Sequence, residues 1–331
     1  MVPEDLQHGA AARVGERLED GVHAVNLPIR LRNRKGTQAR RAGPGSVRQV
    51  TTTTVLVTGA SGRIGGFLRT RLARPGRVLR LLTPDPLPTL AGTGEEELVT
   101  GSVLDEDLLT RATAGVDAVV HLGGIPTEAA FDAVLETNVL GSRRVLEAAH
   151  QGAVRRVVIA SSSHALGFRR REEVVGGVLP DGLPPRPDTY YGWSKAAVEH
   201  LAQLYADRFG QEVVSLRIGA CVERPHTERD LAIWLSPDDV GRLVEAALTG
   251  PVDGHVVVWG VSRNTRAWWS QEAARALGYE ATDDSEVFAA DLLRERAEAG
   301  RTTSDAEDLR TVGGEMLRVP LGRRDEPDGV R

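Results

Sequence analysis

The sequence is poor in lysine, cysteine and aromatic residues. Of its 41 basic residues only Lys35 and Lys195 are lysines, so arginine supplies the remaining 39 positive charges. The single cysteine, Cys221, excludes an internal disulfide and a cysteine-rich metal site, which agrees with a reducing compartment. We therefore predict that the protein binds no metal and lies in the cytoplasm.

Long hydrophobic runs and an excess of positive charge are also lacking. No segment approaches the ~20 consecutive apolar residues of a membrane-spanning helix, and no apolar secretory signal stands near the start. The net charge of −5 argues against nucleic acid as the main partner. The 41% of hydrophobic residues, with 36 glycines and 17 prolines, is an ordinary globular composition. We expect a soluble protein that binds neither membranes nor nucleic acids.

The two ends of the chain differ from the rest. Residues 1–50 hold nine basic and five acidic residues, a net +4, which leaves −9 for residues 51–331. They lack clear periodicity, and residues 30–41 have no aromatic side chains for base stacking. We interpret them as a disordered or wrongly assigned leader; a basic arm for an acidic partner and a targeting peptide are alternatives. Residues 322–331 are expected to form a frayed tail.

Between the ends, short apolar runs alternate with amphipathic stretches, a pattern typical of βαβ units. Six strands are expected, at residues 54–58, 77–82, 96–100, 117–121, 154–160 and 212–217. Helices are expected at residues 63–74, 105–113, 128–150 and 189–209. A helix near 237–248, a strand near 255–259 and a helix near 270–277 are too few for a second domain. The pattern predicts one α/β domain over 51–321, a Rossmann-type doubly wound parallel sheet with a small substrate cap formed mainly by 218–279.

A glycine-rich turn follows the first expected strand. Glycines at three-residue intervals allow a sharp turn, close approach to a pyrophosphate and tight packing of the next helix. The start of that helix then faces the phosphates. We assign this turn to a dinucleotide cofactor, with Gly59, Ser61, Gly62, Arg63, Ile64 and Gly65 as binding residues.

The residue that usually selects NAD is replaced in this chain. About 20 residues beyond a glycine loop, an acidic side chain ordinarily accepts the hydroxyls of the adenosine ribose. Thr83 stands at that position, and Asp85 could reach the ribose if its loop bends back. Arg63 could instead meet the 2′-phosphate of NADP. We predict NAD as the cofactor and leave NADP open.

A tyrosine and a lysine four residues apart open the expected helix at 189–209. Tyr191 and Lys195 share one helical face, whereas Tyr190 is five residues from the lysine and points elsewhere. A phenol acts as a base near neutral pH when a nearby cation favours the phenolate. Ser162 ends an upstream strand and can hold the reacting hydroxyl. We predict Tyr191, Lys195 and Ser162 as the catalytic group.

This order of motifs resembles the extended short-chain dehydrogenase/reductase family, and within it the uronate dehydrogenases. The resemblance covers the chain from about Thr54 to about Gly322. The segments that carry it beyond the glycine loop are residues 121–125, 161–168, 186–195, 209–212, 217–219, 234–239, 257–260 and 268–269.

The resemblance implies NAD-dependent oxidation of a cyclic hexuronic acid, such as galacturonate or glucuronate, at C1 to an aldarolactone. Tyr191 would take the proton of the C1 hydroxyl, Lys195 would lower the pKa of Tyr191 and bind the ribose, and Ser162 would orient the sugar. Arg229 would pair with the substrate carboxylate. The further implied substrate contacts are Ser163 and His164. The further implied cofactor contacts are Ser102, Val103, Leu122, Gly123, Gly124, Asn138 and Ile218. Asn138 matches a family position that supports the active-site geometry, and a helix-internal hydrogen bond is its alternative role.

The chain departs from this family at several contact positions. Pro126 and Ala220 replace substrate-binding serines, and Ser163 replaces an asparagine. Proline has no backbone donor, and alanine offers no side-chain hydrogen bond. A related uronic or aldonic acid therefore stays open as the substrate. Trp268 and Trp269 are expected in the core of the cap, and Cys221 is expected to be buried.

Two other classes of function are alternatives. A nucleotide-sugar epimerase or dehydratase would keep the same tyrosine but would need a basic cradle for a diphosphate. A non-catalytic dinucleotide sensor would often lose Tyr191 or Lys195, and both are present. We also expect the protein to form a homo-oligomer.

Overall fold

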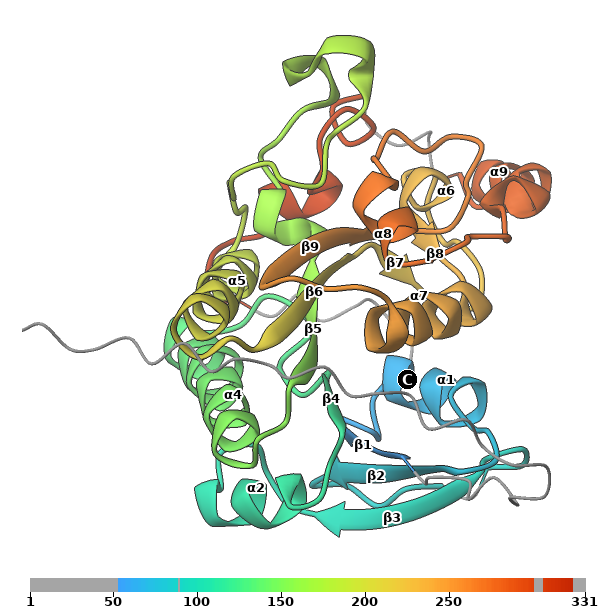
Figure 1. The fold of residues 1–331 in the computed structure, drawn as a ribbon. Coiled ribbons are helices and arrows are strands. Elements are labelled where there is room, and N and C mark those ends of the chain that lie inside the picture. The colour runs from blue at the N-terminus through green and yellow to red at the C-terminus, as the bar shows by residue number, and fades with distance from the viewer. Residues whose placement is uncertain (1–52, 89, 301–305, 324–331) are drawn as a thin grey trace, which may run out of the picture. The chain divides into compact units, whose positions relative to one another are not determined.

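Seven parallel strands form the central sheet of the computed structural model, which describes residues 53–88, 90–300 and 306–323 (Figure 1). The strand order is β3-β2-β1-β4-β5-β6-β9. The strands are β1 (Thr53–Thr58), β2 (Arg77–Thr83), β3 (Glu95–Thr100), β4 (Ala118–His121), β5 (Arg156–Ser162), β6 (Glu212–Ile218) and β9 (His255–Gly260). The order reverses beside β1, between β1 and β4, and such a point is where open α/β sheets bind ligands. The doubly wound fold is therefore confirmed.

Strand β9 corrects the sequence prediction. The sequence predicts that the segment near 255–259 belongs to a substrate cap, but β9 pairs with β6 along its whole length, from Val213↔His255 to Ile218↔Gly260. It inserts Val258 and Trp259, both completely buried, into the sheet layer. A run this apolar gains more from two buried faces than from an exposed cap. The sheet therefore has seven strands instead of six.

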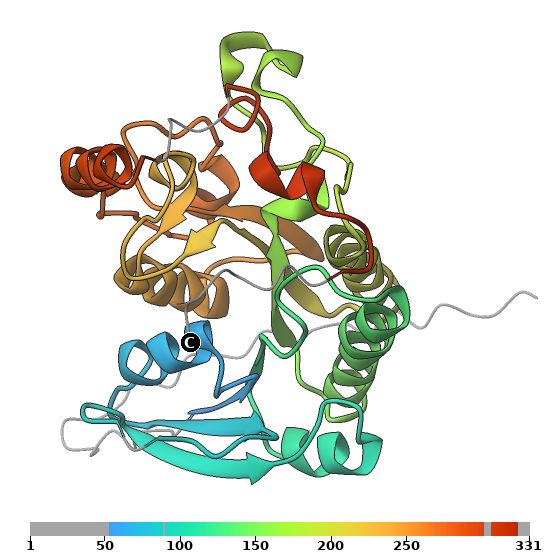
Figure 2. The ribbon, with the colours of Figure 1, turned by 180° about the vertical axis from the view of Figure 1, so that it is seen from behind.

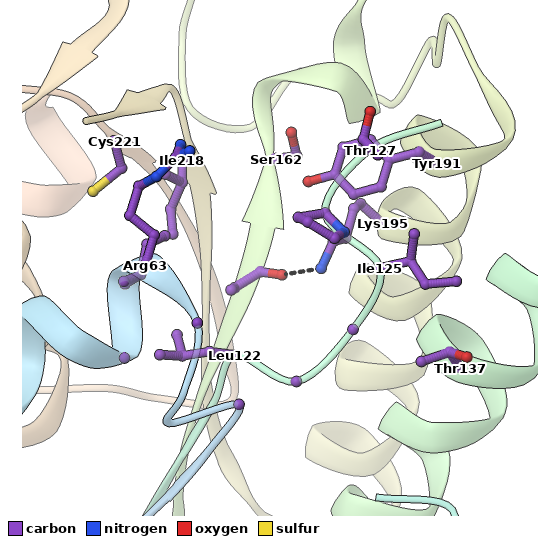
Figure 3. A pocket seen from close by; sticks show the side chains of 18 of the residues that line it. Arg63, Leu122, Ile125, Thr127, Thr137, Ser162, Tyr191, Lys195, Ile218 and Cys221 are labelled. Atoms are coloured by element: carbon purple, nitrogen blue, oxygen red, sulfur yellow. Dashed lines mark hydrogen bonds between the residues drawn. The ribbon is translucent and has the colours of Figure 1, made fainter. Parts of the chain in front are cut away.

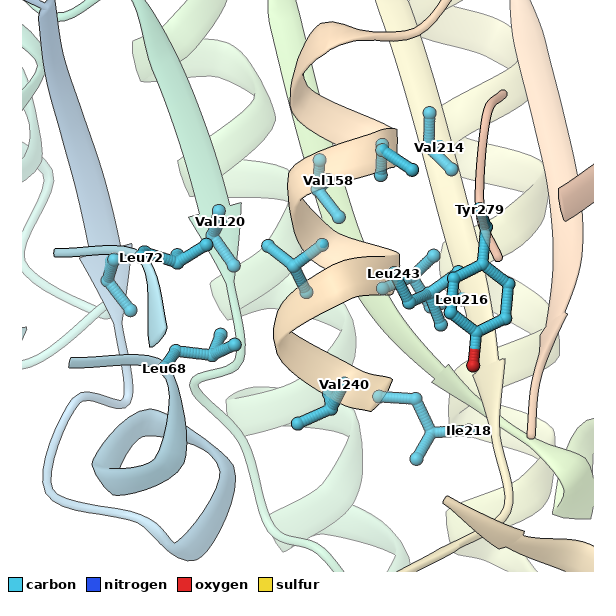
Figure 4. Close-up of a cluster of buried hydrophobic side chains, with 14 of the residues drawn as sticks. Leu68, Leu72, Val120, Val158, Val214, Leu216, Ile218, Val240, Leu243 and Tyr279 are labelled. Carbon is cyan, nitrogen blue, oxygen red and sulfur yellow. The ribbon is translucent and has the colours of Figure 1, made fainter. Parts of the chain in front are cut away.

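Helices cover both faces of the sheet. Helices α1 (Arg63–Arg71) and α7 (Pro237–Thr249) lie on one face, and α2 (Glu106–Thr113), α4 (Gly141–Gln151) and α5 (Tyr190–Phe209) lie on the other (Figure 1). Leu68 of α1 and Leu243 of α7 pack on the first face with side chains such as Val120 and Leu216 (Figure 4). Alternate residues of the same strands face the second layer, so both faces are dry.

The helix predicted at 128–150 is not a regular α-helix throughout, because a π-helical segment lies inside it. It consists of α3 (Phe131–Val134), a π-helical segment η1 (Leu135–Leu140) and α4. Single π turns inside helices often occur at functional sites. The turn carries Asn138, which is buried.

The remaining elements are short helices and a second, smaller sheet. The short helices are η2 (Ser163–Leu166), η3 (Arg171–Glu173), η4 (Val175–Gly177), α6 (Asp230–Ile233), α8 (Glu272–Ala276), η5 (Ser285–Phe288), α9 (Ala289–Glu298) and η6 (Gly314–Arg318). A second, two-stranded sheet joins β7 (Ala220–Cys221) and β8 (Trp234–Leu235). Trp268 and Trp269 stack with ring centroids 4.1 Å apart and are buried against Trp259, so their predicted core role is confirmed.

The C-terminal segment 306–323 lies beside residues 163–188, as Figure 2 shows from behind. The backbone of Gly313 donates to the carbonyl of Gly167, and Gly322 N–H donates to a carboxylate oxygen of Glu128 at 2.8 Å. The beginning of the predicted tail is thus bound to the domain. The predicted leader 1–50 and residues 324–331 lie outside the described residues. Among the described helices, none is long and apolar enough to cross a membrane.

Candidate active site

A cavity of about 910 Å³ follows the carboxyl edge of the sheet. Its wall comes from the glycine turn after β1, the loops after β2 to β6, and the first turns of α5 (Figure 3). This size lies in the ordinary range of ligand sites, and the position is that of nucleotide sites in open α/β sheets. All predicted site residues line this cavity except Thr83 and Asn138.

The glycine turn packs so closely against neighbouring backbone that two of its glycines leave no space for a side chain. Gly59 has a φ of +70°, and a Cβ there would lie 2.7 Å from the amide nitrogen of Gly123. A Cβ on Gly65 would lie 2.6 Å from the carbonyl oxygens of Gly59 and Ala60. Helix α1 begins directly afterwards at Arg63, so its unpaired amides face the cavity. The turn therefore fits a pyrophosphate.

The loop after β2 bends back toward the glycine turn. Thr83 is completely buried and donates from its hydroxyl to Ser61 Oγ at 2.7 Å. Ser61 in turn donates to the carboxylate of Asp85, with 3.3 Å between Oγ and Oδ2. Asp85 lines the cavity and Thr83 lies behind it. Of the two candidates for the ribose position, the structure thus puts the acidic one at the surface of the cavity.

Tyr191 and Ser162 face each other at the far end of the cavity (Figure 3). Thr189 caps α5 by accepting from Gly192 N–H at 2.9 Å, which places Tyr191 in the first turn. The neighbouring Tyr190 does not line the cavity and packs edge-on against Phe131. Tyr191, which its four-residue spacing from Lys195 identifies, is therefore the tyrosine that lines the cavity.

Lys195 lies one turn further along α5. Its Nζ donates to the carbonyl oxygen of Ala160 at 2.8 Å and lies 5.7 Å from the centre of the Tyr191 ring. Burial lowers the pKa of Lys195 to about 8. The ammonium is thus held between the end of β5 and the tyrosine.

The electrostatics at Tyr191 differ from the sequence expectation. Burial raises the pKa of Tyr191, its hydrogen bond with Ser162 lowers that pKa, and the negative charge of Asp188 raises it further. The net direction is upward, opposite to the effect predicted for Lys195. The physical reason is that desolvation of the buried phenolate outweighs its hydrogen bond with Ser162.

Asn138 supports the wall of the cavity from behind. Its Oδ1 accepts from Ile125 N–H at 2.7 Å, and its Nδ2 donates to Ser194 Oγ at 2.9 Å. Ser194 donates to the carbonyl oxygen of Tyr191. Asn138 therefore joins the loop after β4 to the catalytic helix. Asn138 does not itself line the cavity, so its hydrogen bonds agree with a supporting role in the active-site geometry and give it no direct place on the cofactor surface.

A buried histidine extends this network under the cavity. His121 lies within hydrogen-bond distance of Thr58 Oγ1 (2.7 Å) and Ser142 Oγ (2.9 Å), and burial lowers its pKa to about 3. Ser142 donates its own proton to Asn138 O, so it accepts from Nε2 of a neutral His121. Thr58 then donates to Nδ1 and accepts from Gly123 N–H. The network fixes one tautomer.

The substrate end contains a cation without an acidic partner. Arg229 lines the cavity and donates from Nη2 to Val312 O, while its buried Nε has no hydrogen-bond partner among the described residues. It forms no ion pair with the described carboxylates. Burial lowers its pKa, and this effect outweighs the negative charges of Asp230, Asp188, Glu315 and Asp308, which raise it. A desolvated guanidinium of this kind is suited to an anionic group of a ligand.

The other predicted substrate residues lie close to Tyr191. Ser163 is buried and lines the cavity. His164 lies with its ring 6.1 Å from that of Tyr191, and its Nδ1 is 2.7 Å from a carboxylate oxygen of Asp188. Cys221 is buried as predicted and also lines the wall.

Two carboxylates were missed by the sequence reasoning. Asp188 is completely buried in its side chain, and Glu128 accepts from Tyr191 N–H at 2.9 Å. Each could have been suspected because an acidic residue near a helix start favours the positive end of the dipole. Their partners were not predictable, because His164 and Gly322 are distant in sequence. No cluster that could hold a metal ion is found in the described part of the chain.

The chain is similar to known dehydrogenases over most of its length. Residues 55–279 match the NAD dependent epimerase/dehydratase family. Uronate dehydrogenase from Pseudomonas putida is 41% identical over 245 residues, which are 74% of this chain and 90% of that enzyme. The crystal structure of uronate dehydrogenase from Agrobacterium tumefaciens superposes with a TM-score of 0.73 at 37% identity, covering 82% of this chain and 98% of that one.

A variant of the Agrobacterium tumefaciens enzyme complexed with NAD has the same TM-score of 0.73, at 36% identity. It covers 81% of this chain and 98% of the solved one. The matched range 55–279 contains the glycine turn, the tyrosine–lysine pair and the sheet except for the first two residues of β1. The chain belongs to the NAD dependent epimerase/dehydratase family, together with the uronate dehydrogenases.

Proposed function

We propose that this protein is an NAD-dependent oxidoreductase that oxidises a hexuronic acid at C1 to the aldarolactone. The observation that carries the proposal is one cavity that contains both a group suited to remove a hydroxyl proton and an anion-binding group. Tyr191, Ser162 and Lys195 supply the first, and the unpaired guanidinium of Arg229 supplies the second. The relatives named as uronate dehydrogenases support the same substrate class.

The reaction removes a proton from the C1 hydroxyl and a hydride from C1. Bound NAD supplies a positively charged ring that accepts the hydride. Tyr191 accepts the hydroxyl proton as general base, and Ser162 holds the same oxygen by a hydrogen bond. The tyrosine's raised pKa means that it needs added positive charge to act near neutral pH. Lys195 contributes an ammonium, and the cofactor ring would contribute a second charge.

Asp85 is the residue we assign to the adenosine ribose. Its carboxylate lines the cavity and is held by Ser61, so it can accept from both ribose hydroxyls. The same charge repels a 2′-phosphate, which favours NAD over NADP. The glycine turn and the start of α1 would hold the pyrophosphate.

A nucleotide-sugar epimerase or dehydratase fits the cavity less well. Its substrate carries a diphosphate, which needs several cations outside the cofactor turn. The cationic residues on the described wall are Arg63, Lys195 and Arg229, and the first two lie beside the cofactor path. One arginine suits a single carboxylate better than a diphosphate.

The direct test is formation of NADH from galacturonate or glucuronate, with Tyr191→Phe as the catalytic control. We expect absorbance at the NADH band with at least one of the two acids and none with the control. Because Pro126 and Ala220 line the wall, aldonic and other uronic acids belong in the same panel. Absence of NADH and NADPH with every sugar acid would reject the proposal.

The carboxylate assignment makes a separate prediction. Arg229→Ala should raise the KM for galacturonate roughly 30-fold or more and change kcat little, because a desolvated charge pair is lost. Steady-state kinetics with saturating NAD measures both constants. An unchanged KM would show that Arg229 does not bind the carboxylate.

The assignment of Asp85 to the adenosine ribose makes a further prediction. Asp85→Ala should weaken NAD binding about tenfold and improve NADP binding, because two hydrogen bonds and one repulsive charge are removed. Calorimetric titration with each cofactor, without any sugar, measures this. If the substitution changed NAD and NADP binding equally, Asp85 would not be the residue that selects between the two cofactors.

We further propose that the protein works in the cytoplasm as a homo-oligomer. Exposed apolar side chains on the outer helices support the homo-oligomer, because apolar surface left in water favours association. Leu204 and Phe209 of α5 and Leu140 before α4 are 55%, 44% and 38% exposed. Light scattering of the purified protein, compared with Leu204→Glu, tests it.

A further inference from the structure

The contact between His164 and Asp188 has no role in the reaction described so far. The two residues come from different segments, η2 after β5 and the residue before the cap of α5. Their Nδ1 and Oδ2 atoms are 2.7 Å apart, and the Asp188 side chain has no exposed surface. His164 retains 16% exposure at the cavity wall. The pair thus connects a fully buried carboxylate to the cavity.

Three glycines from three segments surround this carboxylate. A Cβ built on Gly167, Gly313 or Gly192 would lie 2.0, 2.2 or 2.8 Å from an oxygen of Asp188. The remaining contact of the carboxylate is to the Thr189 hydroxyl, which donates to Oδ1 at 3.0 Å. The chain therefore encloses the Asp188 side chain so closely that its orientation is fixed.

A fixed carboxylate determines which nitrogen of the imidazole carries the hydrogen. The Asp188 oxygen accepts a hydrogen bond, so Nδ1 of His164 carries the hydrogen. Nε2 has no hydrogen-bond partner among the described residues, and in the neutral ring it is an acceptor. Paired carboxylates commonly set the tautomer of functional histidines in this way. Nε2 of His164 is thus a hydrogen-bond acceptor at the cavity wall, close to Tyr191.

We propose that Asp188 is a positioning residue for substrate recognition, which holds His164 so that Nε2 accepts a hydrogen bond from a ring hydroxyl of the sugar near C1. Arg229 takes the carboxylate at the same end of the cavity. The proposal rests on the proposed function, since it needs a hydroxylated sugar acid as substrate. It gives the site a hydrogen-bond acceptor in addition to its cation.

A double-mutant cycle tests whether Asp188 acts through His164. Asp188→Asn has the same shape, and it should raise the KM for galacturonate about tenfold with kcat within about threefold and NAD binding unchanged. In a His164→Ala background the same change should raise KM no further. An equal rise in both backgrounds would mean that Asp188 only supports the fold, and the proposal would fail.

A spectroscopic measurement needs neither turnover nor a folded Asp188 variant. In wild-type protein labelled with ¹⁵N-histidine and saturated with NAD, the signal that His164→Ala removes should report a protonated Nδ1 and a bare Nε2. A protonated Nε2 with a bare Nδ1 would overturn the proposal. If the wild type gave no NADH from any sugar acid while this tautomer was observed, the proposed function would fail and the positioning of His164 would stand.

Discussion

At the scale of single residues, Lys195 has a setting that an arginine could not share. It is the one lysine among the described residues, although arginine serves everywhere on the surface. Its Nζ is enclosed between the Ala160 carbonyl and the Tyr191 ring, and burial lowers its pKa to about 8. A compact ammonium fits this space and can turn its donors to a ribose, whereas a planar guanidinium is larger and rigid.

This setting predicts that Lys195→Arg is far from conservative. We expect kcat/KM to fall by about 100-fold or more, because both the proposed contact with the ribose and the charge near Tyr191 are displaced. The measurement is steady-state kinetics, with the thermal midpoint recorded to show that the variant is folded. Near-normal kcat/KM would mean that position 195 needs only a positive charge.

The orientation of Asp85 depends on hydrogen bonds that its position in the sequence does not reveal. The expected acidic position holds Thr83, and sequence alone left open whether Asp85 turns toward the cofactor or into solvent. The bend follows from hydrogen bonds: Thr83 Oγ1 accepts from Asp85 N–H at 3.2 Å and donates to Ser61. Thr83, which replaces the acid, therefore helps to place Asp85 at the cavity.

At the scale of elements, the start of α1 contains two neighbouring glycines, of which only the first is required by its surroundings. A Cβ on Gly65 would meet backbone oxygens, whereas a Cβ on Gly66 would have no atom within 4 Å. The first glycine is needed for contact between helix and turn. The second is an ordinary helix-interior glycine, which is destabilising relative to alanine.

These neighbours form a matched pair of variants. Gly65→Ala should weaken NAD binding roughly 10- to 100-fold, because relieving the overlap displaces the turn. Gly66→Ala should leave NAD binding unchanged and raise the free energy of unfolding by about 0.5–1 kcal/mol. Calorimetric titration and urea unfolding measure the two effects. Equal weakening of NAD binding in both variants would contradict this account of the turn.

The helix predicted over 128–150 shows what periodicity misses within an element. Its apolar spacing predicts a continuous helix, but η1 widens the turn where Asn138 bonds to Ile125 and Ser194. These partners are 13 and 56 residues away. A local pattern contains no signal for such bonds, so the π turn follows from the tertiary structure.

At the scale of the whole molecule, His121 and its hydrogen bonds join the sheet to the helix layer. Its pKa is lowered by burial to about 3, so the folded protein keeps it neutral where the unfolded chain binds a proton. Between the ordinary value of 6.5 and about 3, the unfolded state therefore holds more protons. The stability that this neutral histidine contributes is present above pH 6.5 and is lost as the pH falls toward 3.

The prediction concerns the variant His121→Gln. It should be destabilised at pH 7, and its deficit relative to wild type should shrink as the pH falls from 6.5 toward 3. Urea unfolding at several pH values measures the difference. His226→Gln, at an exposed position, is the control and should show no such trend. A deficit independent of pH would mean that His121 is not held neutral.

The sequence by itself determined the strands of the sheet, the glycine turn and the helical face shared by Tyr191 and Lys195. These features depend on spacings of two to six residues, which propensity and backbone geometry fix locally. Even there the ends were approximate: the helix predicted to reach residue 74 ends at Arg71.

Only the tertiary structure decided the seventh position of the sheet, the pairing of His164 with Asp188 and the contact of the C-terminal segment with Arg229. Arg229 and Val312 are 83 residues apart, and strand β9 pairs with β6 across a long connection. Such contacts form where burial of apolar surface and satisfaction of polar groups outweigh the entropy of closing the chain. That balance is a property of the packed molecule, and no short stretch of sequence contains it.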